Sequence, residues 1–414
     1  MGSLAHHGYV GDLYIDLASD TEGHLNISVP FLNEHVTQPL YQGRTTLYLG
    51  RNLTIPGTFI ENRGIHLTTS VPVSVYVTNY ISNTFATYLA FPLNTLGNTY
   101  QILSSKTRFN IGSEFMVIGV HDFTQVRVTY VNGTVNTKVI HRLVCYQEFQ
   151  SIDMTGTHIE TDKPVTVLSG TDCASFDGFD CNMLMVQLHP VKLWDSAYIA
   201  PSFHIDNITI VQVRVTTANE SIQIDIKHSA TGETSQLNSD INLVKEEVAN
   251  NTASLIASNQ PFQVGVYSGS SEMSLTVLPG IHQYLNDYHL VMPVYTTYIQ
   301  NHYIVVIISR VYLEKDGSSG IVVDGQVMSS PVVSYRGPDP FQLFIYRVTN
   351  GYHHIRHTNN AEFGLLCVGV GPNIVYTFPG GIRFSEEGTY VLKQRKETMV
   401  HPIIPTIIRT DILY

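Results

Sequence analysis

One short pattern, with a proline at its centre, recurs along the chain and limits what the chain can fold into. It reads HLTTSVPVSVYV around Pro72, HIETDKPVTVLS around Pro164 and LIASNQPFQVGV around Pro261. Apolar residues alternate on both sides of each proline, as in strands that bury one face. A Thr or Ser three residues earlier suits a turn, and a proline fits where no ladder N–H is needed. We therefore expect a proline-broken hairpin at each site and a degraded fourth copy, without proline, at 354–370.

A second landmark follows each of the three proline patterns. It is a connector in which a tyrosine comes eight or nine residues after a proline, as in PLNTLGNTY, PVKLWDSAY and PGIHQYLNDY. Together the two landmarks repeat at the length of a domain of seven to nine short strands, which is the size of a β-sandwich. The sequence predicts an all-β chain of four tandem sandwich-like units with little helix. The expected units are 1–92, 93–190, 191–282 and 283–385, followed by a C-terminal extension at 386–414.

The composition agrees with extended structure and excludes some partners. Charged residues make up only 14% of the 414 residues, against about 25% in an average soluble domain. The formal net charge is −11 and no Lys/Arg cluster is present, so neither nucleic acid nor an anionic membrane is an expected partner. The most apolar run, 303–309, is far shorter than the roughly 20 residues of a membrane-spanning helix. One helical turn or two is expected within 238–251, capped by Ser239 or Asp240.

The middle of the chain resembles a known family. The stretch DMTGTHIETDKPVTVLSGTDCA at 153–174, followed by CNMLMVQLHPVKLWDSAYIAP at 181–201, is similar to the signature of the IgGFc-binding protein N-terminal domain family. The end AEFGLLCVGVGPNIVYTFPGG at 361–381 resembles the family's closing motif. Two departures stand out, because Asp195 replaces the usual Gly after Trp194 and Cys367 lies in a strand that normally lacks Cys. The resemblance covers roughly residues 10–385 and leaves the tail outside.

The resemblance implies an extracellular, adhesive or mucus-associated binding module. Members of this family sit in large mucus proteins beside von Willebrand-type modules, so the chain is expected to be part of a larger multidomain protein. Its expected partners are extracellular glycoproteins, and immunoglobulin Fc is implied only by the family name. The family also pairs its cysteines in the middle block, which implies a Cys173–Cys181 disulfide in an exported chain and leaves two free thiols as the alternative in a reducing compartment. Buried free thiols are favoured over a mutual pair for Cys145 and Cys367.

Six N-x-[ST] acceptors give mild support for secretion, since several would arise by chance in a chain rich in Asn and Thr. The segment 1–16 lacks the apolar core of a signal peptide. We therefore expect a piece of a longer secreted protein or an incomplete gene model, with a cytosolic chain as the alternative. The glycosylation candidates are Asn26, Asn52, Asn132, Asn207, Asn219 and Asn250.

Metal, cofactor and catalytic signatures do not rise above chance. The carboxylates Asp172, Asp177 and Asp180 lie close in sequence, but their spacing fits no EF-hand, so a solvated loop is expected. On an extended strand His353 and His357 share one face with Ile355 between them and His354 faces away, which is a poor arrangement for one ion. No His-Glu-x-x-His, G-x-S-x-G or dinucleotide motif in its required context is present. No metal, no cofactor and no catalytic residue is expected.

The sequence thus predicts non-enzymatic binding through loops and exposed Tyr-rich strands, which offer large contact area with a polar handle. Two rival functions remain open. A lectin-like carbohydrate-binding module would need clustered aromatic and amide or carboxylate side chains on one concave face. A glycosidase, the less favoured rival, would need two carboxylates about 5–10 Å apart in one cleft.

Overall fold

The computed structural model describes residues 11–384 with short internal gaps, together with 411–413. Antiparallel strands form nearly all of it, which confirms the all-β prediction. Every helix among the described residues is a 3₁₀ turn of three residues, as expected for a chain with little helix. These turns are η1 (Pro30–Leu32), η2 (Leu93–Thr95), η4 (Val191–Leu193), η5 (Ile281–Gln283) and η6 (Arg310–Tyr312).

The strands fall into four groups along the chain, called here the first to fourth strand groups. The first contains two four-stranded sheets and the second is one eight-stranded sheet. In the first group β4 (Gly43–Gly50), β1 (Asp12–Ser19), β7 (Ser74–Ile81) and β8 (Thr84–Leu89) form one sheet, and β3 (Glu34–Leu40), β2 (Gly23–Val29), β6 (His66–Thr69) and β33 (Asp411–Leu413) form the other. In the second group the order is β12 (Val135–Ile140), β11 (Thr124–Thr129), β14 (His158–Ala174), β10 (Ser113–Gly119), β13 (Cys145–Gln150) and β5 (Phe59–Glu61), with β9 (Gly97–Gln101) and β15 (Asn182–Gln187) also on β14.

The third group resembles the second in its sheet, and the fourth resembles the first. The third is again one eight-stranded sheet, whereas the fourth is divided into sheets of four and five strands. In the third group the order is β17 (His204–Ile205), β18 (Ile208–Thr217), β22 (Thr252–Gly269), β19 (Ile222–His228) and β20 (Thr234–Ser239), with β16 (Asp195–Ser202) and β23 (Met273–Val277) on β22 and β21 (Val244–Glu246) on β18. The fourth group holds β24 (Asp287–Met292), β30 (Gly351–His357), β26 (Ile321–Val323) and β27 (Gln326–Val327), and beside them β28 (Val333–Arg336), β29 (Phe341–Val348), β25 (Asn301–Ser309), β31 (Phe363–Gly371) and β32 (Ile374–Pro379).

The helical turn expected within 238–251 is not formed where the structure describes that stretch. Ser239 ends β20, and β21 (Val244–Glu246) pairs with β18 instead of coiling. Pairing with a neighbouring strand satisfies the backbone groups of a short segment that would gain little from an isolated turn. The proposed cap Asp240 lies outside the described residues.

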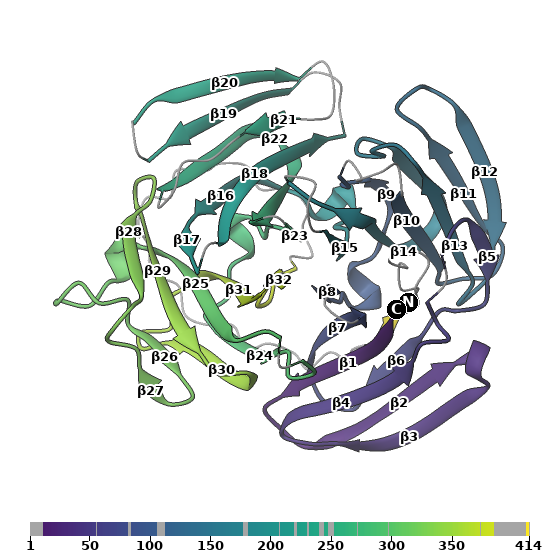
Figure 1. Cartoon of the computed structure of the whole chain (residues 1–414), viewed down its shortest axis with the longest axis horizontal. Coiled ribbons are helices and arrows are strands. Elements are labelled where there is room, and N and C mark those ends of the chain that lie inside the picture. Colours follow the sequence, from purple (N-terminus) through teal and green to yellow (C-terminus); the bar gives the residue numbers. More distant parts are fainter. Residues whose placement is uncertain are drawn as a thin grey trace, which may run out of the picture.

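The four groups stand around a common centre (Figure 1). Strand β8 contacts β15, β15 contacts β23, β23 contacts β32, and β32 contacts β8, so one strand of each group closes an inner ring. Asn182, at the start of β15, is almost fully buried there. Its amide donates to the carbonyls of Phe85, Met273 and Val375 at 3.0–3.1 Å and accepts the Phe85 N–H. One side chain therefore ties the second group to the other three.

The hydrophobic cores lie between consecutive groups rather than inside each one. One core joins Leu13 and Leu67 of the first group to Met116 and Met185 of the second. Three further cores join the second group to the third, the third to the fourth, and the fourth back to the first. Each group thus depends on both neighbours for burial. The division into four units at the predicted boundaries stays a prediction.

The recurring prolines do not mark hairpins. Pro164 lies inside the single 17-residue strand β14 and Pro261 inside the 18-residue strand β22, whereas Pro72 lies between β6 and β7. Around Pro164 the register shifts as β14 passes from β9 and β11 to β10 and β15. A proline is tolerated at such a change of partner because no ladder N–H is required. The hydroxyl three residues earlier stabilises the bend, since the Thr161 hydroxyl donates to the Lys163 carbonyl at 2.7 Å.

Candidate binding surface

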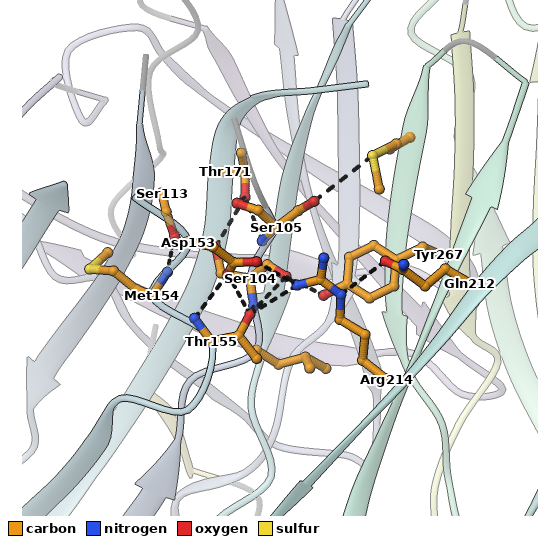
Figure 2. A network of polar contacts seen from close by, with 12 residues as sticks. Ser104, Ser105, Ser113, Asp153, Met154, Thr155, Thr171, Gln212, Arg214 and Tyr267 are labelled. Carbon is orange, nitrogen blue, oxygen red and sulfur yellow. Dashed lines mark hydrogen bonds and ion pairs between the residues drawn. The ribbon is translucent and has the colours of Figure 1, made fainter. Parts of the chain in front are cut away.

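A buried polar network joins the second and third strand groups (Figure 2). At its centre Arg214, on β18, donates through Nη1 to Asp153 Oδ2 and to the Ser104 carbonyl, both at 2.8 Å, and to Thr155 Oγ1 at 3.1 Å. Its Nε donates to Gln212 Oε1 at 2.9 Å. The guanidinium also lies over the ring of Tyr267, 4.8 Å from the centroid. The charge of a nearly buried arginine is thereby fully paired.

This network explains why Asp153 and Thr155 belong to the sequence signature. Asp153 Oδ1 accepts the N–H and the hydroxyl of Thr155, at 3.0 and 2.6 Å, which shapes the turn before β14. Its other oxygen holds Arg214 of the next group. Because both carboxylate oxygens are occupied, the residue joins two strand groups and is not a free acid or base. Burying a charge requires such pairing, since an unpaired buried charge is strongly destabilising.

A hollow of about 300 Å³ lies directly beside this network. The turn after β11 and the connection from β13 to β14 form its walls, and the side chains of Val131 and Ile152 are 62% and 61% exposed there. Exposed apolar side chains next to polar groups are typical of a binding surface. The lining residues are Tyr130, Val131, Asn132, Gln150, Ile152, Asp153, Met154 and Thr157.

The chemistry of this hollow is neutral. Asp153 is paired with Arg214, and burial raises the pKa of Tyr130, so its hydroxyl stays protonated at neutral pH. The remaining polar side chains are the amides of Asn132 and Gln150 and the hydroxyl of Thr157, which are all uncharged. A hollow of this kind suits uncharged polar or apolar ligand groups such as sugars or protein side chains. Asn132 is also a glycosylation candidate, and a glycan on it would stand at the rim.

The hollow that the described residues form at the centre of the ring is much smaller. The cavity between the four inner strands measures about 10 Å³, which is room for about one water molecule. His189 lines it, and complete burial lowers the pKa of this imidazole to about 4, so the side chain is neutral. Within the described residues, ligand binding is therefore expected on the outer surface and not along the axis.

The structure joins Cys173, at the end of β14, to Cys181, just before β15, in a disulfide with Cα atoms 5.2 Å apart. Cys145 and Cys367 are buried free cysteines, and burial raises the pKa of both thiols. The disulfide closes the loop that carries two of the three clustered aspartates. Asp172 is buried in β14, and Asp177 and Asp180 lie outside the described residues.

The glycosylation candidates are placed only in part. Asn26, Asn52 and Asn132 are exposed, as a glycan acceptor must be. Whether they carry glycans stays a prediction. Asn207, Asn219 and Asn250 lie outside the described residues.

Two buried carboxyl groups lie on neighbouring strands, but no described cavity reaches them. Glu114 on β10 and Asp172 on β14 are 1% and 4% exposed. Burial, and next the charge of Asp172, raise the pKa of Glu114 well above its usual range. Neither residue lines either hollow described above. A glycosidase pair must flank a sugar-sized cleft, so this arrangement does not favour that rival.

The departure at Asp195 also has a structural reason. In the preceding repeat the matching position is Gly97, where an added Cβ would meet the ring of Pro190. At the next junction Gly280 stands in place of that proline, and the Asp195 carboxylate packs against it. Asp195 then accepts the His282 backbone N–H at 3.0 Å and pairs with the His282 imidazole at 2.8 Å. This hydrogen bond to Asp195 raises the pKa of His282.

The histidines of β30 lie on the two faces that the sequence predicts, but His354 makes a contact that the sequence did not reveal. His353 and His357 are buried on one face of the strand, and His353 Nδ1 pairs with Asp324 at 2.7 Å. His354 points to the opposite face, where it lies beside His289 of β24. Sequence reasoning missed this contact, as it missed the Asp153–Arg214 pair, because each joins residues more than 60 positions apart.

Comparison with known proteins identifies the family of the chain. A family profile described as "IgGFc binding protein" matches residues 86–369. A curated relative, the IgGFc-binding protein of Homo sapiens, is 22% identical over 341 residues. The match covers 77% of this chain and only 6% of that relative's length. No helix among the described residues has the length and apolar character to cross a membrane.

Proposed function

Because the chain belongs to the IgGFc-binding protein family, we propose that it is an extracellular, non-enzymatic module that binds glycoproteins in mucus or matrix. The relative's name makes immunoglobulin Fc the first partner to test. The relative is far longer than this chain, so the proposal concerns one module within a larger protein.

The observation that carries the proposal is the neutral hollow beside β11 and β14. Val131 and Ile152 expose apolar surface at its rim, and no strand of the described chain covers them. Interfaces draw most of their affinity from a few side chains that become buried near the centre of the contact. The signature residues Asp153 and Thr155 also support binding at this hollow and not at the signature itself, because their side chains hydrogen-bond within the protein and join two strand groups.

Non-enzymatic binding is also supported by how the titratable groups are used. The Asp153–Arg214 pair is internal to the protein, and Glu114 is buried away from the described hollows. The carboxylates that a hydrolase would need in a cleft are thus absent from the described hollows, apart from the paired Asp153. A purified chain that turned over a glycoside, and lost that activity in Glu114→Gln, would overturn this part.

The binding test uses the whole purified chain over immobilised Fc and, separately, over a purified mucin. We expect binding to at least one of the two and a loss of about tenfold in affinity for Ile152→Ser, which corresponds to about 1.4 kcal/mol. Val327→Ser is the matched control, because Val327 is similarly exposed on β27, outside the hollow. Equal affinities for the two variants, or no binding to either surface, would contradict the proposal.

A lectin-like function is the second candidate. The hollow combines the Tyr130 ring with the amides of Asn132 and Gln150, which is a set of groups that also suits a sugar. Enzymatic removal of glycans from the immobilised mucin separates the two functions. Binding that survives deglycosylation favours a protein epitope, and binding that disappears favours the carbohydrate.

A further inference from the structure

Strands β24 and β30 bring together three metal-ligating side chains that are far apart in sequence. His289 and His354 are directly opposite each other in the antiparallel register. Asp287 is two residues before His289 and therefore points to the same face of the sheet. One ligand atom from each of the three lies within 4.8 Å of the others. Among the described residues, this is the one cluster of three or more such side chains with that spacing.

The distances within the cluster are those of groups that converge on one point. Asp287 Oδ1 lies 2.8 Å from His354 Nε2 and 3.6 Å from His289 Nε2. The two imidazole rings are stacked, with centroids 4.3 Å apart and planes 12° from parallel. Two nitrogens and a carboxylate oxygen at this separation need only small ring rotations to reach the bond lengths of about 2.0–2.2 Å that zinc requires.

A further contact orients one of the imidazoles. His289 Nδ1 is 2.7 Å from the Tyr352 hydroxyl, on the same face of β30 as His354. A metal-ligating histidine is normally held in this way, with its second ring nitrogen hydrogen-bonded to a neighbouring group. The Tyr352 contact occupies Nδ1 and leaves Nε2 directed toward Asp287.

The charged groups around the cluster are of both signs. Asp287 and, farther off, Asp20 contribute negative charge. Arg356 stands opposite Asp287 in the register, so its positive charge disfavours the binding of a cation at this site. A divalent ion would thus bind against the repulsion of one positive neighbour.

We propose that Asp287, His289 and His354 form a binding site for a zinc-class divalent cation. Two imidazoles and one carboxylate are the donor set that zinc accepts, with a fourth position left to water. Asp287 is 49% exposed, so this position faces solvent. The site is on the fourth strand group and is separate from the hollow of the second group. The proposed metal site therefore does not depend on the proposed binding function.

The test is a titration of the whole purified chain with Co²⁺, followed by its visible absorption, and with Zn²⁺, followed by calorimetry. We expect one ion per chain with a dissociation constant in the micromolar range. His289→Gln and His354→Gln should each weaken binding by at least tenfold. Arg356→Gln should strengthen it, which a variant that merely disturbs the fold would not do.

His35→Gln serves as the control for non-specific binding, because this histidine is exposed on β3 and outside the cluster. It should bind one ion as the unaltered chain does. Thermal melting without metal checks that all variants are folded. No saturable binding below about 100 μM, or equal binding by the His289 and His35 variants, would overturn the proposal.

Discussion

The first strand group differs from the other three in where one of its strands comes from. In the second, third and fourth groups, β9, β16 and β24 follow the local proline connector and pair with β14, β22 and β30. In the first group the corresponding place on β6 is taken by β33, from the far end of the chain. The paired residues are Tyr100 with Ile159, Tyr198 with Ile256, Tyr288 with Ile355, and in the first group Ile412 with Leu67.

The difference shows what the connector tyrosine does. In three groups its buried hydroxyl accepts a backbone N–H three residues earlier and donates to a backbone carbonyl of the same group. This carbonyl lies just after the bend of the long strand in the second and third groups and at the start of β31 in the fourth. For Tyr198 these bonds, to Asp195 and Phe262, measure 2.9 and 2.5 Å. Isoleucine has no hydroxyl, so Ile412 cannot make these two side-chain hydrogen bonds, and β33 pairs with β6 through the backbone ladder. The C-terminal segment thus completes the first strand group without the tyrosine hydrogen bonds that the local strands have.

The largest effect is expected where all four groups meet, at Asn182. Asn182→Ala would leave three carbonyls and one N–H without their partner in the centre of the ring, so we expect a loss of about 4 kcal/mol in the free energy of unfolding. Chemical denaturation measures it. Asn98→Ala, which removes one bond to the Thr161 carbonyl, is the control and should cost about 1 kcal/mol. Similar losses in both variants would argue against a central tie.

The connector tyrosines come next. Tyr198→Phe leaves a buried N–H and a buried carbonyl unsatisfied, which should cost about 2–4 kcal/mol, and the same holds for Tyr100→Phe. Ile412→Val is the counterpart in the first group and removes no hydrogen bond. It should cost about 1 kcal/mol or less. If the tyrosine variants were as stable as the Ile412 variant, the distinction between local and C-terminal strands would fail.

Removing β33 should affect the first group most. Deletion of residues 411–414 frees one edge of β6, and we expect a loss of roughly 1–3 kcal/mol from the short ladder. An exposed strand edge also invites pairing with another chain, so the truncated protein should self-associate more readily, which light scattering would detect. Deletion of Tyr414 alone is the control. A truncated chain with unchanged stability and size would show that β33 does not hold the edge.

The smallest effect concerns the junction of the third and fourth groups. The hydrogen bond to Asp195 raises the pKa of His282 in the folded chain, so the stabilisation is full below the unfolded pKa of about 6.5 and is lost as pH rises through the folded value. The difference in stability between the unaltered chain and His282→Gln should therefore shrink as pH rises above about 6.5. A difference independent of pH between 5 and 9 would contradict this assignment.

The sequence predicts the all-β class because alternation and the proline and tyrosine landmarks are local signals. It does not predict that Pro164 lies inside one long strand, since a local pattern cannot show which N–H lacks a partner. Arg214 and Asp153 are 61 residues apart, and nothing near either one signals the other. Ile412 was overlooked for a different reason, because it takes the place of a tyrosine without sharing its chemistry. The hollow at Val131 and Ile152 likewise forms only once two loops meet.

Hydrogen–deuterium exchange of the intact chain tests most directly whether the C-terminal segment completes the first strand group as the local strands complete the other three. The account predicts that amides of β6 exchange slowly, close to those of β14, β22 and β30 in their first halves, because β33 covers the edge of β6. Fast exchange at 66–69, with the other three strands protected, would contradict the account. Strand β6 would then be an open edge, and the C-terminal segment would not be part of the first group.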